Sequence, residues 1–292
     1  MAGNGLWLAH RDIRRKDRFH ARGSDWFRAS RLESITGNRA IAALLLDGTV
    51  AQERIRVFAE NAQSRLPWNS VTLLPPVTDA AKIICLGLNY KDHATETKMA
   101  LPTFPSIFLR TQTTLVGHGS PIVRPKNSTQ LDYEGELVAV IGRRARHIRK
   151  PDSLDYVAGY SIFNDASIRD FQLRTSQWTI GKNFDRTGGF GPELVTADEL
   201  PPGATGLRLQ TRLNGDVLQN ANTTDMVFGV ARTIELLSAC MTLGPGDLLV
   251  MGTPSGVGLS RQPQLWMKPG DTCEVEIEGI GTLTNPIIED TA

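Results

Sequence analysis

Two glutamates separated by a single residue are the first candidates for chemistry in this chain. Glu134 and Glu136 occupy alternate positions, so in a strand their side chains would point to the same side. Adjacent carboxylates repel each other unless a cation neutralises them, and hard oxygen ligands suit Mg²⁺, Mn²⁺ or Ca²⁺. Alternating glutamates are also common on exposed strands, so the pattern alone leaves both a metal site and a solvated strand face open.

A third carboxylate and a lysine could complete such a site. Asp165 ends the apolar segment 160–165, and strand ends are where loops meet and binding sites form. Three carboxylates would exceed the two positive charges of the cation, and Lys182 could balance the remainder. A lone lysine is otherwise most often a surface residue, which is the alternative interpretation of Lys182.

His93 and Glu96 form a second cluster. They lie three residues apart, which places both on one face if the segment is a short helix. A carboxylate that holds one imidazole nitrogen orients the other nitrogen to take a proton from water near neutral pH. An exposed pair on a helix surface has the same spacing, so this alternative stays open. The remaining histidines have no such partner and are interpreted as structural or surface residues: His10, His20, His118 and His147.

Strand patterns dominate the chain beyond residue 80 and would position these side chains. The segment 207–213 alternates apolar and polar residues and runs into Asn214-Gly215, the preferred pair for a tight type I′ hairpin turn. The alternation over 272–278 predicts a strand with one face in solvent, formed by its glutamates. Further strands are predicted at 82–86, 136–142, 156–163 and 247–251.

One helix is predicted to follow Thr223-Thr224-Asp225, which are good N-cap residues, and to end at Gly244-Pro245-Gly246. Apolar residues recur in it every three or four positions: Met226, Val230, Ile234, Leu237 and Met241. This periodicity predicts that the two methionines fill the core.

The chain is predicted to divide into a small N-terminal domain over residues 1–76 and one large domain over residues 77–292. The first thirty or so residues mix many arginines with acids, which favours a solvated, partly mobile segment over an acid-poor transit peptide. A strand is predicted at 40–46 and a helix at 50–62. The pair Pro75-Pro76 cannot continue a helix or a central strand, which indicates a linker.

Composition and charge exclude several classes of protein. Lys and Arg total 32 against 31 Asp and Glu, a net charge of +1, so a polyanionic partner such as nucleic acid is not expected. No apolar run approaches the roughly 18 residues of a membrane-spanning helix, so no membrane partner is expected either. The cysteines Cys85, Cys240 and Cys273 lack zinc-site or disulfide spacing. They are predicted to be small buried residues in a reducing compartment, with the cytoplasm as the expected location.

Eight sequence blocks occur in order between residues 82 and 285: KIICLGLNYKDHATE, DYEGELVAVIG, GYSIFNDASIRDFQ, WTIGKNFD, FGPELVT, LNGDVLQNANTTDM, LGPGDLLVMGTPSGVG and PGDTCEVEIEGIGTLTN. With these blocks the chain resembles the fumarylacetoacetate hydrolase family. The resemblance implies an α+β, β-rich fold, in which a mixed β-roll is joined to a small N-terminal domain, and a homodimer. It also implies that Glu134, Glu136 and Asp165 hold Mg²⁺ or Mn²⁺.

The same resemblance implies roles for further residues. His93 and Glu96 would be the water-activating dyad, and Lys182 would lie close to metal and substrate. Substrate contacts would come from Arg169, Gln172 and Thr253. The chain departs from the family pattern in having Met251 before the Gly-Thr-Pro loop and Arg110 where lysine is common. Arg110 keeps the charge but offers a planar fork, so the chain is expected to differ in its preference for a substrate headgroup.

These residues together predict a hydrolase that cleaves a carbon–carbon bond in a 1,3-diketo acid of the acylpyruvate or fumarylpyruvate type. A divalent metal would bind the 2-oxo acid, and the His93–Glu96 dyad would activate water. Two rivals use the same metal site without water: decarboxylation of oxaloacetate-like acids, and isomerisation or tautomerisation of a dienoic diacid. A noncatalytic binding protein is disfavoured, because the three acids and Lys182 are all retained.

Overall fold

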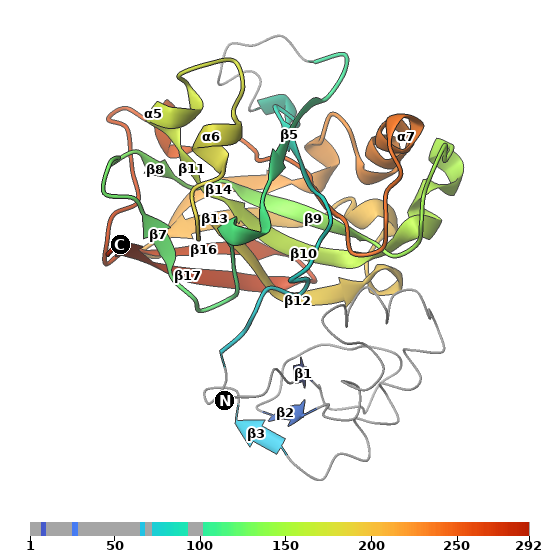
Figure 1. Cartoon of the computed structure of the whole chain (residues 1–292), viewed down its shortest axis with the longest axis horizontal. Helices are drawn as coiled ribbons and strands as arrows, with labels where there is room; N and C mark the ends of the chain where they lie inside the picture. The colour runs from blue at the N-terminus through green and yellow to red at the C-terminus, as the bar shows by residue number, and fades with distance from the viewer. Residues whose placement is uncertain (1–6, 10–24, 29–64, 68–71, 93–101, 292) are drawn as a thin grey trace.

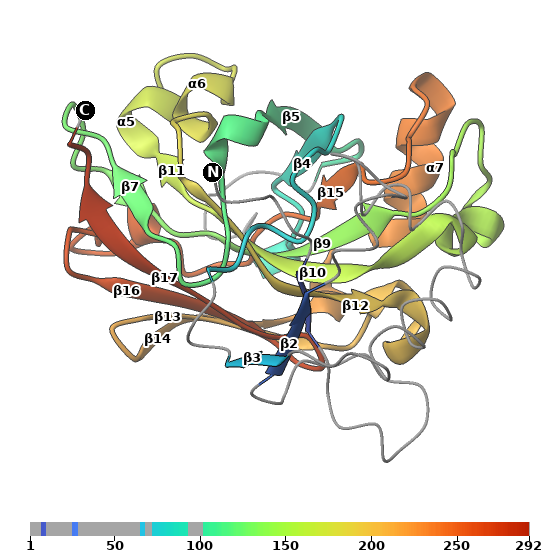
Figure 2. The ribbon, with the colours of Figure 1, turned by 60° about the horizontal axis from the view of Figure 1, so that its bottom comes forward.

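Strands dominate the computed structural model, which describes residues 7–9, 25–28, 65–67, 72–92 and 102–291. Two large sheets pack against each other, with short helices at their margins (Figures 1 and 2). This arrangement confirms the β-rich α+β fold, a mixed β-roll, that the sequence predicts. No helix among the described residues is both long and apolar enough to cross a bilayer.

The larger sheet contains seven strands in the order β5-β4-β15-β9-β10-β12-β6. The pairs β4/β15 and β12/β6 are parallel and the others antiparallel, so the sheet is mixed. Its central strands β9 and β10 are almost continuously buried, which is why they read as apolar runs in the sequence. The strand bounds are β4 Ile83–Gly87, β5 Ser106–Arg110, β6 Leu115–Val116, β9 Gly135–Ile141, β10 Val157–Asp165, β12 Gly188–Thr196 and β15 Leu248–Val250.

The second sheet has five strands in the order β14-β13-β16-β17-β7. Val275 and Ile277 of β16 point into the core, whereas Glu274 and Glu276 pair with Arg212 on the other face, as the alternation predicts. The inward residues share one apolar core with β9 and β10 of the larger sheet. The strand bounds are β7 Ile122–Arg124, β13 Arg208–Leu213, β14 Asp216–Asn222, β16 Thr272–Ile277 and β17 Gly281–Glu289.

Short elements complete the described fold. β8 (Leu131–Asp132) pairs with β11 (Ser167–Ile168). The helices are α5 Arg169–Gln172, α6 Thr179–Lys182 and α7 Val230–Cys240. Both α5 and α6 are single turns, and they lie on the side of the fold where β9 begins (Figure 1).

Three short strands belong to the N-terminal region: β1 Trp7–Ala9, β2 Asp25–Arg28 and β3 Arg65–Pro67 form an antiparallel sheet. None of these three strands is predicted from the sequence. The predicted strand at 40–46 and the predicted helix at 50–62 lie outside the described residues. The boundary between residues 76 and 77 stays a prediction.

The predicted hairpin between β13 and β14 is confirmed. Leu213 pairs with Asp216, which leaves Asn214 and Gly215 as the two turn residues. Their φ angles are 53° and 91°, and a type I′ turn requires positive φ at both central positions. The register shifts by one residue beyond the turn: Arg212 pairs with Val217 but Thr211 pairs with Gln219. This bulge places Gln219 of β14 beside Thr211 in the interior.

The predicted helix start is wrong. Thr223–Asp225 forms a separate 3-10 turn, and α7 begins only at Val230. Asn89 explains the gap: its carbonyl accepts Val227 N at 2.7 Å, and its side chain accepts Phe228 N at 2.8 Å. These contacts hold the intervening segment extended, so the apolar spacing continues across two elements.

The cysteine prediction is correct for two of the three residues. Cys85 and Cys273 are buried in strands, and burial raises the pKa of the Cys273 thiol to about 12, so it is not a nucleophile at neutral pH. Cys240 is the last residue of α7 and is exposed. All three are free thiols.

Candidate metal and substrate site

Three carboxylates converge where β9 begins and β10 ends. The antiparallel register pairs Gly135 with Asn164, and Asp165 N donates to the carbonyl of Glu134 at 2.8 Å. Glu134 and Glu136 flank Gly135, so both lie beside Asp165, and one oxygen of each carboxylate falls within 4.8 Å of the others. All three residues are buried. The alternate spacing therefore brings the acids together inside the fold and not on a solvated face.

This acidic triad fits a hard divalent cation. Burial, together with the neighbouring Asp165 and Glu134, raises the pKa of the Glu136 carboxyl well above its usual range. Gathering three carboxylates away from water is costly unless positive charge compensates them. An all-oxygen donor set suits Mg²⁺, Mn²⁺ or Ca²⁺ and not zinc or copper. The burial and the donor chemistry both favour a resident divalent metal.

Lys182 supplies positive charge to the triad from the end of α6. Its Nζ lies 2.7 Å from Glu134 Oε2 and 2.6 Å from Asp165 Oδ2. Burial opposes the charged form, but Asp165 and Glu134 raise the pKa of the Lys182 ammonium above its ordinary value. The lysine is therefore a buried cation at neutral pH and not the surface residue that is the usual alternative.

Arg169 supplies a second cation from the start of α5. Its Nε donates to Asp132 Oδ2 at 2.8 Å, and its Nη1 lies 2.7 Å from Glu134 Oε1 and 2.8 Å from Gln172 Oε1. Burial opposes the charge, but Asp132 and Glu134 raise the pKa of the guanidinium above its ordinary value. The remaining nitrogen, Nη2, is buried and has no hydrogen-bond partner among the described residues. A buried donor without a partner is costly, so Nη2 favours an acceptor at this position.

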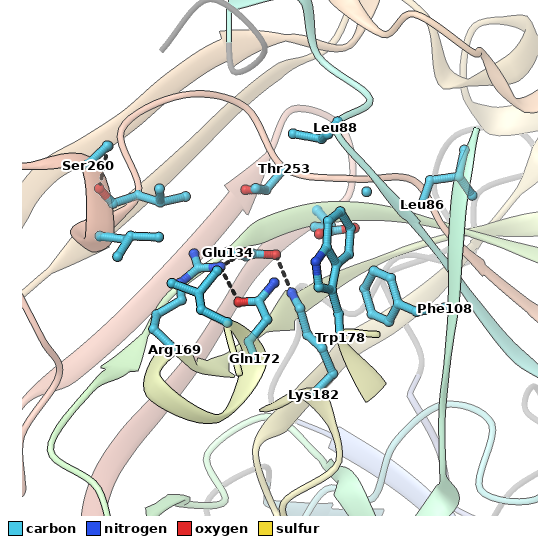
Figure 3. Close-up of a pocket in the computed structure, with 15 residues that line it drawn as sticks. Leu86, Leu88, Phe108, Glu134, Arg169, Gln172, Trp178, Lys182, Thr253 and Ser260 are labelled. Atoms are coloured by element: carbon cyan, nitrogen blue, oxygen red, sulfur yellow. Dashed lines mark hydrogen bonds and ion pairs between the residues drawn. The ribbon is translucent and has the colours of Figure 1, made fainter. Parts of the chain in front are cut away.

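The charged groups line a cavity of about 380 Å³. Figure 3 shows Arg169, Gln172 and Lys182 gathered around Glu134, with Phe108 and Trp178 beyond the lysine. The two aromatic rings meet edge to face with centroids 5.8 Å apart. The apolar side chains of the lining are Leu86, Leu88, Phe108, Leu173, Trp178, Val257 and Leu259. A cavity with one charged side and one apolar side suits a small organic acid that carries at least one anionic group.

Comparison with protein families decides the identity of this fold and site. The model that describes the C-terminal region of fumarylacetoacetate (FAA) hydrolase matches residues 82–288. The chain belongs to the fumarylacetoacetate hydrolase family. Members of this family are enzymes that act on small molecules, and the buried acids of this chain fit the divalent metal of such enzymes.

Relatives within the family carry different activities in their names. The mitochondrial oxaloacetate tautomerase of Xenopus laevis is 39% identical over 82% of this chain and 76% of its own length. A 2-hydroxyhepta-2,4-diene-1,7-dioate isomerase from Mycobacterium marinum is 39% identical, covers 79% of this chain and 82% of its own, and has a TM-score of 0.68. A fumarylacetoacetate hydrolase from Exiguobacterium antarcticum is 32% identical, covers 98% and 100%, and has a TM-score of 0.79. Membership in the family therefore does not distinguish hydrolysis from tautomerisation.

Most of the residues that the family resemblance implicates lie together. The cavity is lined by Glu134, Glu136, Arg169, Gln172, Lys182 and Thr253. Asp165 adjoins them through its contact with Lys182. His93 and Glu96 lie outside the described residues, so the dyad stays a prediction. The homodimer and the cytoplasmic location also stay predictions, and the Xenopus relative is named as mitochondrial.

Arg110 contacts the acidic triad from the side of β5. Its guanidinium is buried against Asp165, and it donates to Thr187 Oγ1 at 2.7 Å and Thr114 Oγ1 at 3.3 Å. It is not among the residues that line the cavity. The planar fork holds a member of the acidic triad and two threonines together, which favours a positioning role over the substrate contact suggested by the sequence.

Two buried polar residues of the site are absent from the sequence prediction. Asp132 accepts the backbone N–H groups of Gly258 and Leu259 at 2.7 and 2.9 Å, and it also binds Arg169. It continues the alternation of Glu134 and Glu136 by one step, a signal that could have found it. Gln219 has partners 8, 34 and 84 residues away, so no local pattern indicates it.

Proposed function

We propose that this chain is a divalent-metal-dependent enzyme that interconverts the keto and enol forms of a 2-oxo diacid of the oxaloacetate type. The proposal is carried by the buried acidic triad with Lys182 and Arg169 at one small cavity. The relatives named for tautomerisation and isomerisation are 39% identical to the chain, compared with 32% for the hydrolase from Exiguobacterium.

The described residues supply what an enolisation needs. A divalent cation held by Glu134, Glu136 and Asp165 would polarise the 2-oxo group and make the neighbouring carbon more acidic. Lys182 places a further positive charge near the oxygen that becomes negative in the enolate. Arg169 has its fork at the cavity and one donor without a partner among the described residues, which suits a substrate carboxylate.

Proton transfer at the carbon next to the 2-oxo group requires a base. His93 is the candidate, with Glu96 to orient its imidazole, because an imidazole near its ordinary pKa can both take and return a proton at neutral pH. This part of the proposal rests on the sequence spacing alone. In the decarboxylation of the same acids, the site would hold the enolate but release carbon dioxide in place of a proton.

Hydrolysis of a 1,3-diketo acid is the second candidate function, and the His93-x-x-Glu96 spacing is the observation that favours it. In this version His93 takes the proton from water, and the hydroxide attacks the distal carbonyl. Collapse of the adduct then breaks the carbon–carbon bond and yields a carboxylic acid and the enolate of pyruvate. Lys182 and Arg169 keep the same roles in both versions.

A substrate panel separates these activities. With Mg²⁺ present, we expect the protein to accelerate the conversion of enol-oxaloacetate to the keto form by roughly 100-fold or more over buffer, the usual contribution of a positioned acid or base. The decay of the enol absorbance measures this rate, and a chelator should remove the effect. Pyruvate formation from oxaloacetate and acid release from acylpyruvates are measured in parallel. Acid release without any effect on the enol would overturn the tautomerase proposal in favour of the hydrolase.

Arg169→Lys tests the carboxylate contact. Lysine keeps the positive charge but lacks the planar guanidinium, whose several donors let Arg169 contact Asp132, Glu134 and a substrate at the same time. Because a hydrogen bond to a charged group contributes about 1.5–3 kcal/mol, we expect the KM for oxaloacetate to rise about ten- to hundredfold, with a smaller change in kcat. Arg174→Lys, on an exposed arginine nearby, is the matched control and should leave KM unchanged. An unchanged KM in Arg169→Lys would exclude this contact.

A further inference from the structure

Gln219 lies in the second sheet, on β14, yet its side chain reaches the site on the first sheet. The residue is 1% exposed. Its Oε1 accepts Gly135 N at 3.0 Å and Thr211 Oγ1 at 2.7 Å. Gly135 is the residue between Glu134 and Glu136, so the amide of Gln219 binds the peptide that joins two members of the acidic triad.

The same amide also binds the loop that follows β15. Gln219 Nε2 donates to Thr253 Oγ1 at 2.8 Å and to the carbonyl of Pro254 at 2.9 Å. Gly135 N can only donate and the Pro254 carbonyl can only accept, so these partners determine which end of the amide carries oxygen. Both lone pairs and both hydrogens of the amide are used. Gln219 is therefore a fully satisfied link between the hairpin, β9 and the loop.

Thr253 closes this network on the other side of the same residue. Its hydroxyl donates to the carbonyl of Gly135 at 3.1 Å while it accepts from Gln219. Gly135 is thus held at its N–H by Gln219 and at its carbonyl by Thr253. The neighbouring Gly252 N donates to Glu136 Oε2 at 2.5 Å, so the loop also fixes one of the carboxylates directly. The only hydroxyl hydrogen of Thr253 is used in this network, so its Oγ1 can act toward a further group only as an acceptor.

Gly135 permits the close approach on which these contacts depend. A Cβ at this position would lie 2.2 Å from Thr211 Oγ1 and 2.9 Å from Val275 Cγ1. Any other residue would push the β13–β14 hairpin away from β9 and break the bond to Gln219. The glycine in the Glu-Gly-Glu motif is thereby explained by packing between the two sheets.

We propose that Gln219 is a positioning residue for the metal site: it fixes the spacing of Glu134 and Glu136 and places the Thr253 loop against them. The proposal rests on the metal site of the proposed function but not on the reaction catalysed there. Partners that orient metal ligands in this way typically change metal affinity by about 10–100-fold when they are removed.

The test measures Mn²⁺ affinity by calorimetry on the whole protein, without substrate. Gln219→Met keeps the length of the side chain and removes every hydrogen bond, and we expect the dissociation constant to rise about 10–100-fold. Thr211→Val is the matched control in the same buried network. It removes one bond to Gln219 but leaves the bonds to Gly135 and Thr253, so it should lower the melting temperature while Mn²⁺ affinity stays that of the wild type.

Thr253→Val gives a second measurement that does not depend on the folding of Gln219→Met. It removes the hydroxyl that joins Gln219 to the carbonyl of Gly135. We expect it to weaken Mn²⁺ binding in the same direction. Wild-type affinity in a folded Gln219→Met protein, or in Thr253→Val if the first variant does not fold, would overturn the proposal. Failure of the wild-type protein to bind Mn²⁺ would overturn the metal site and the role of Gln219 together. Mn²⁺ binding without tautomerase activity would overturn only the reaction.

Discussion

Glu136→Gln is expected to weaken Mn²⁺ binding by roughly 100-fold or more and to abolish metal-dependent turnover. Removing residues that only orient ligands costs about 10–100-fold in affinity, so the loss of a ligand charge should reach at least the upper end of that range. Glutamine has the same shape, and its carbonyl can still accept Gly252 N, so the fold should be retained. Calorimetry with Mn²⁺ measures the affinity.

Thermal unfolding gives an independent measurement of the same substitution. A ligand at 100 times its dissociation constant stabilises the folded state by about 2.7 kcal/mol, so Mg²⁺ should raise the melting temperature of the wild type but not that of Glu136→Gln. Without metal the variant should be no less stable than the wild type, because one of three mutually repelling carboxylates is gone. Glu278→Gln, on an exposed glutamate, is the control. Wild-type Mn²⁺ affinity in Glu136→Gln would show that the metal binds elsewhere.

Lys182→Met should lower kcat by about 10²–10³-fold, the usual cost of losing one group that stabilises a developing oxyanion. The substitution removes a positive charge 2.7 and 2.6 Å from two carboxylate oxygens of the triad. The site then becomes more negative, so Mn²⁺ affinity should stay the same or increase. Steady-state kinetics and calorimetry on the same sample measure the two effects.

A lower kcat without a loss of Mn²⁺ affinity would distinguish a catalytic role of Lys182 from a purely structural one. A lysine that only stabilised the fold would, on removal, reduce turnover and metal binding together. Lys150→Met, on an exposed lysine, should leave both quantities unchanged. A weaker affinity for Mn²⁺ in Lys182→Met would contradict the role proposed for this residue.

Local patterns in the sequence predict β4, β9, β10 and β15 of the larger sheet and β13, β14 and β16 of the second sheet. The apolar run of β9 and the alternation of Glu274 and Glu276 in β16 each depend on whether one or two faces are buried, and that is visible from neighbouring residues. The Asn214-Gly215 turn likewise depends on φ preferences of the two residues themselves. Such features are predictable because all the residues that determine them lie within a few positions of one another in the sequence.

The errors have the opposite origin. The predicted start of the helix is wrong because Asn89, about 140 positions away along the chain, binds Val227 and Phe228. Distance along the chain also hides the surroundings of Arg110: its charge is visible in the sequence, but its partner Asp165 lies 55 positions away. The apolar neighbours of Cys240 predict burial, yet the residue is exposed at the end of α7.

The sequence by itself determined the chemistry that is possible: three oxygen ligands with cations nearby, on strands whose period places Glu134 and Glu136 on one side. The tertiary structure alone decided that these groups gather at one buried site, that Arg110 contacts Asp165 of the triad, and that Gln219 joins the two sheets at Gly135. The physical reason is how far apart in the sequence the interacting residues lie. Side-chain direction along a strand is a local property, but the partners that fix a buried carboxylate come from distant elements and are set by how the sheets pack.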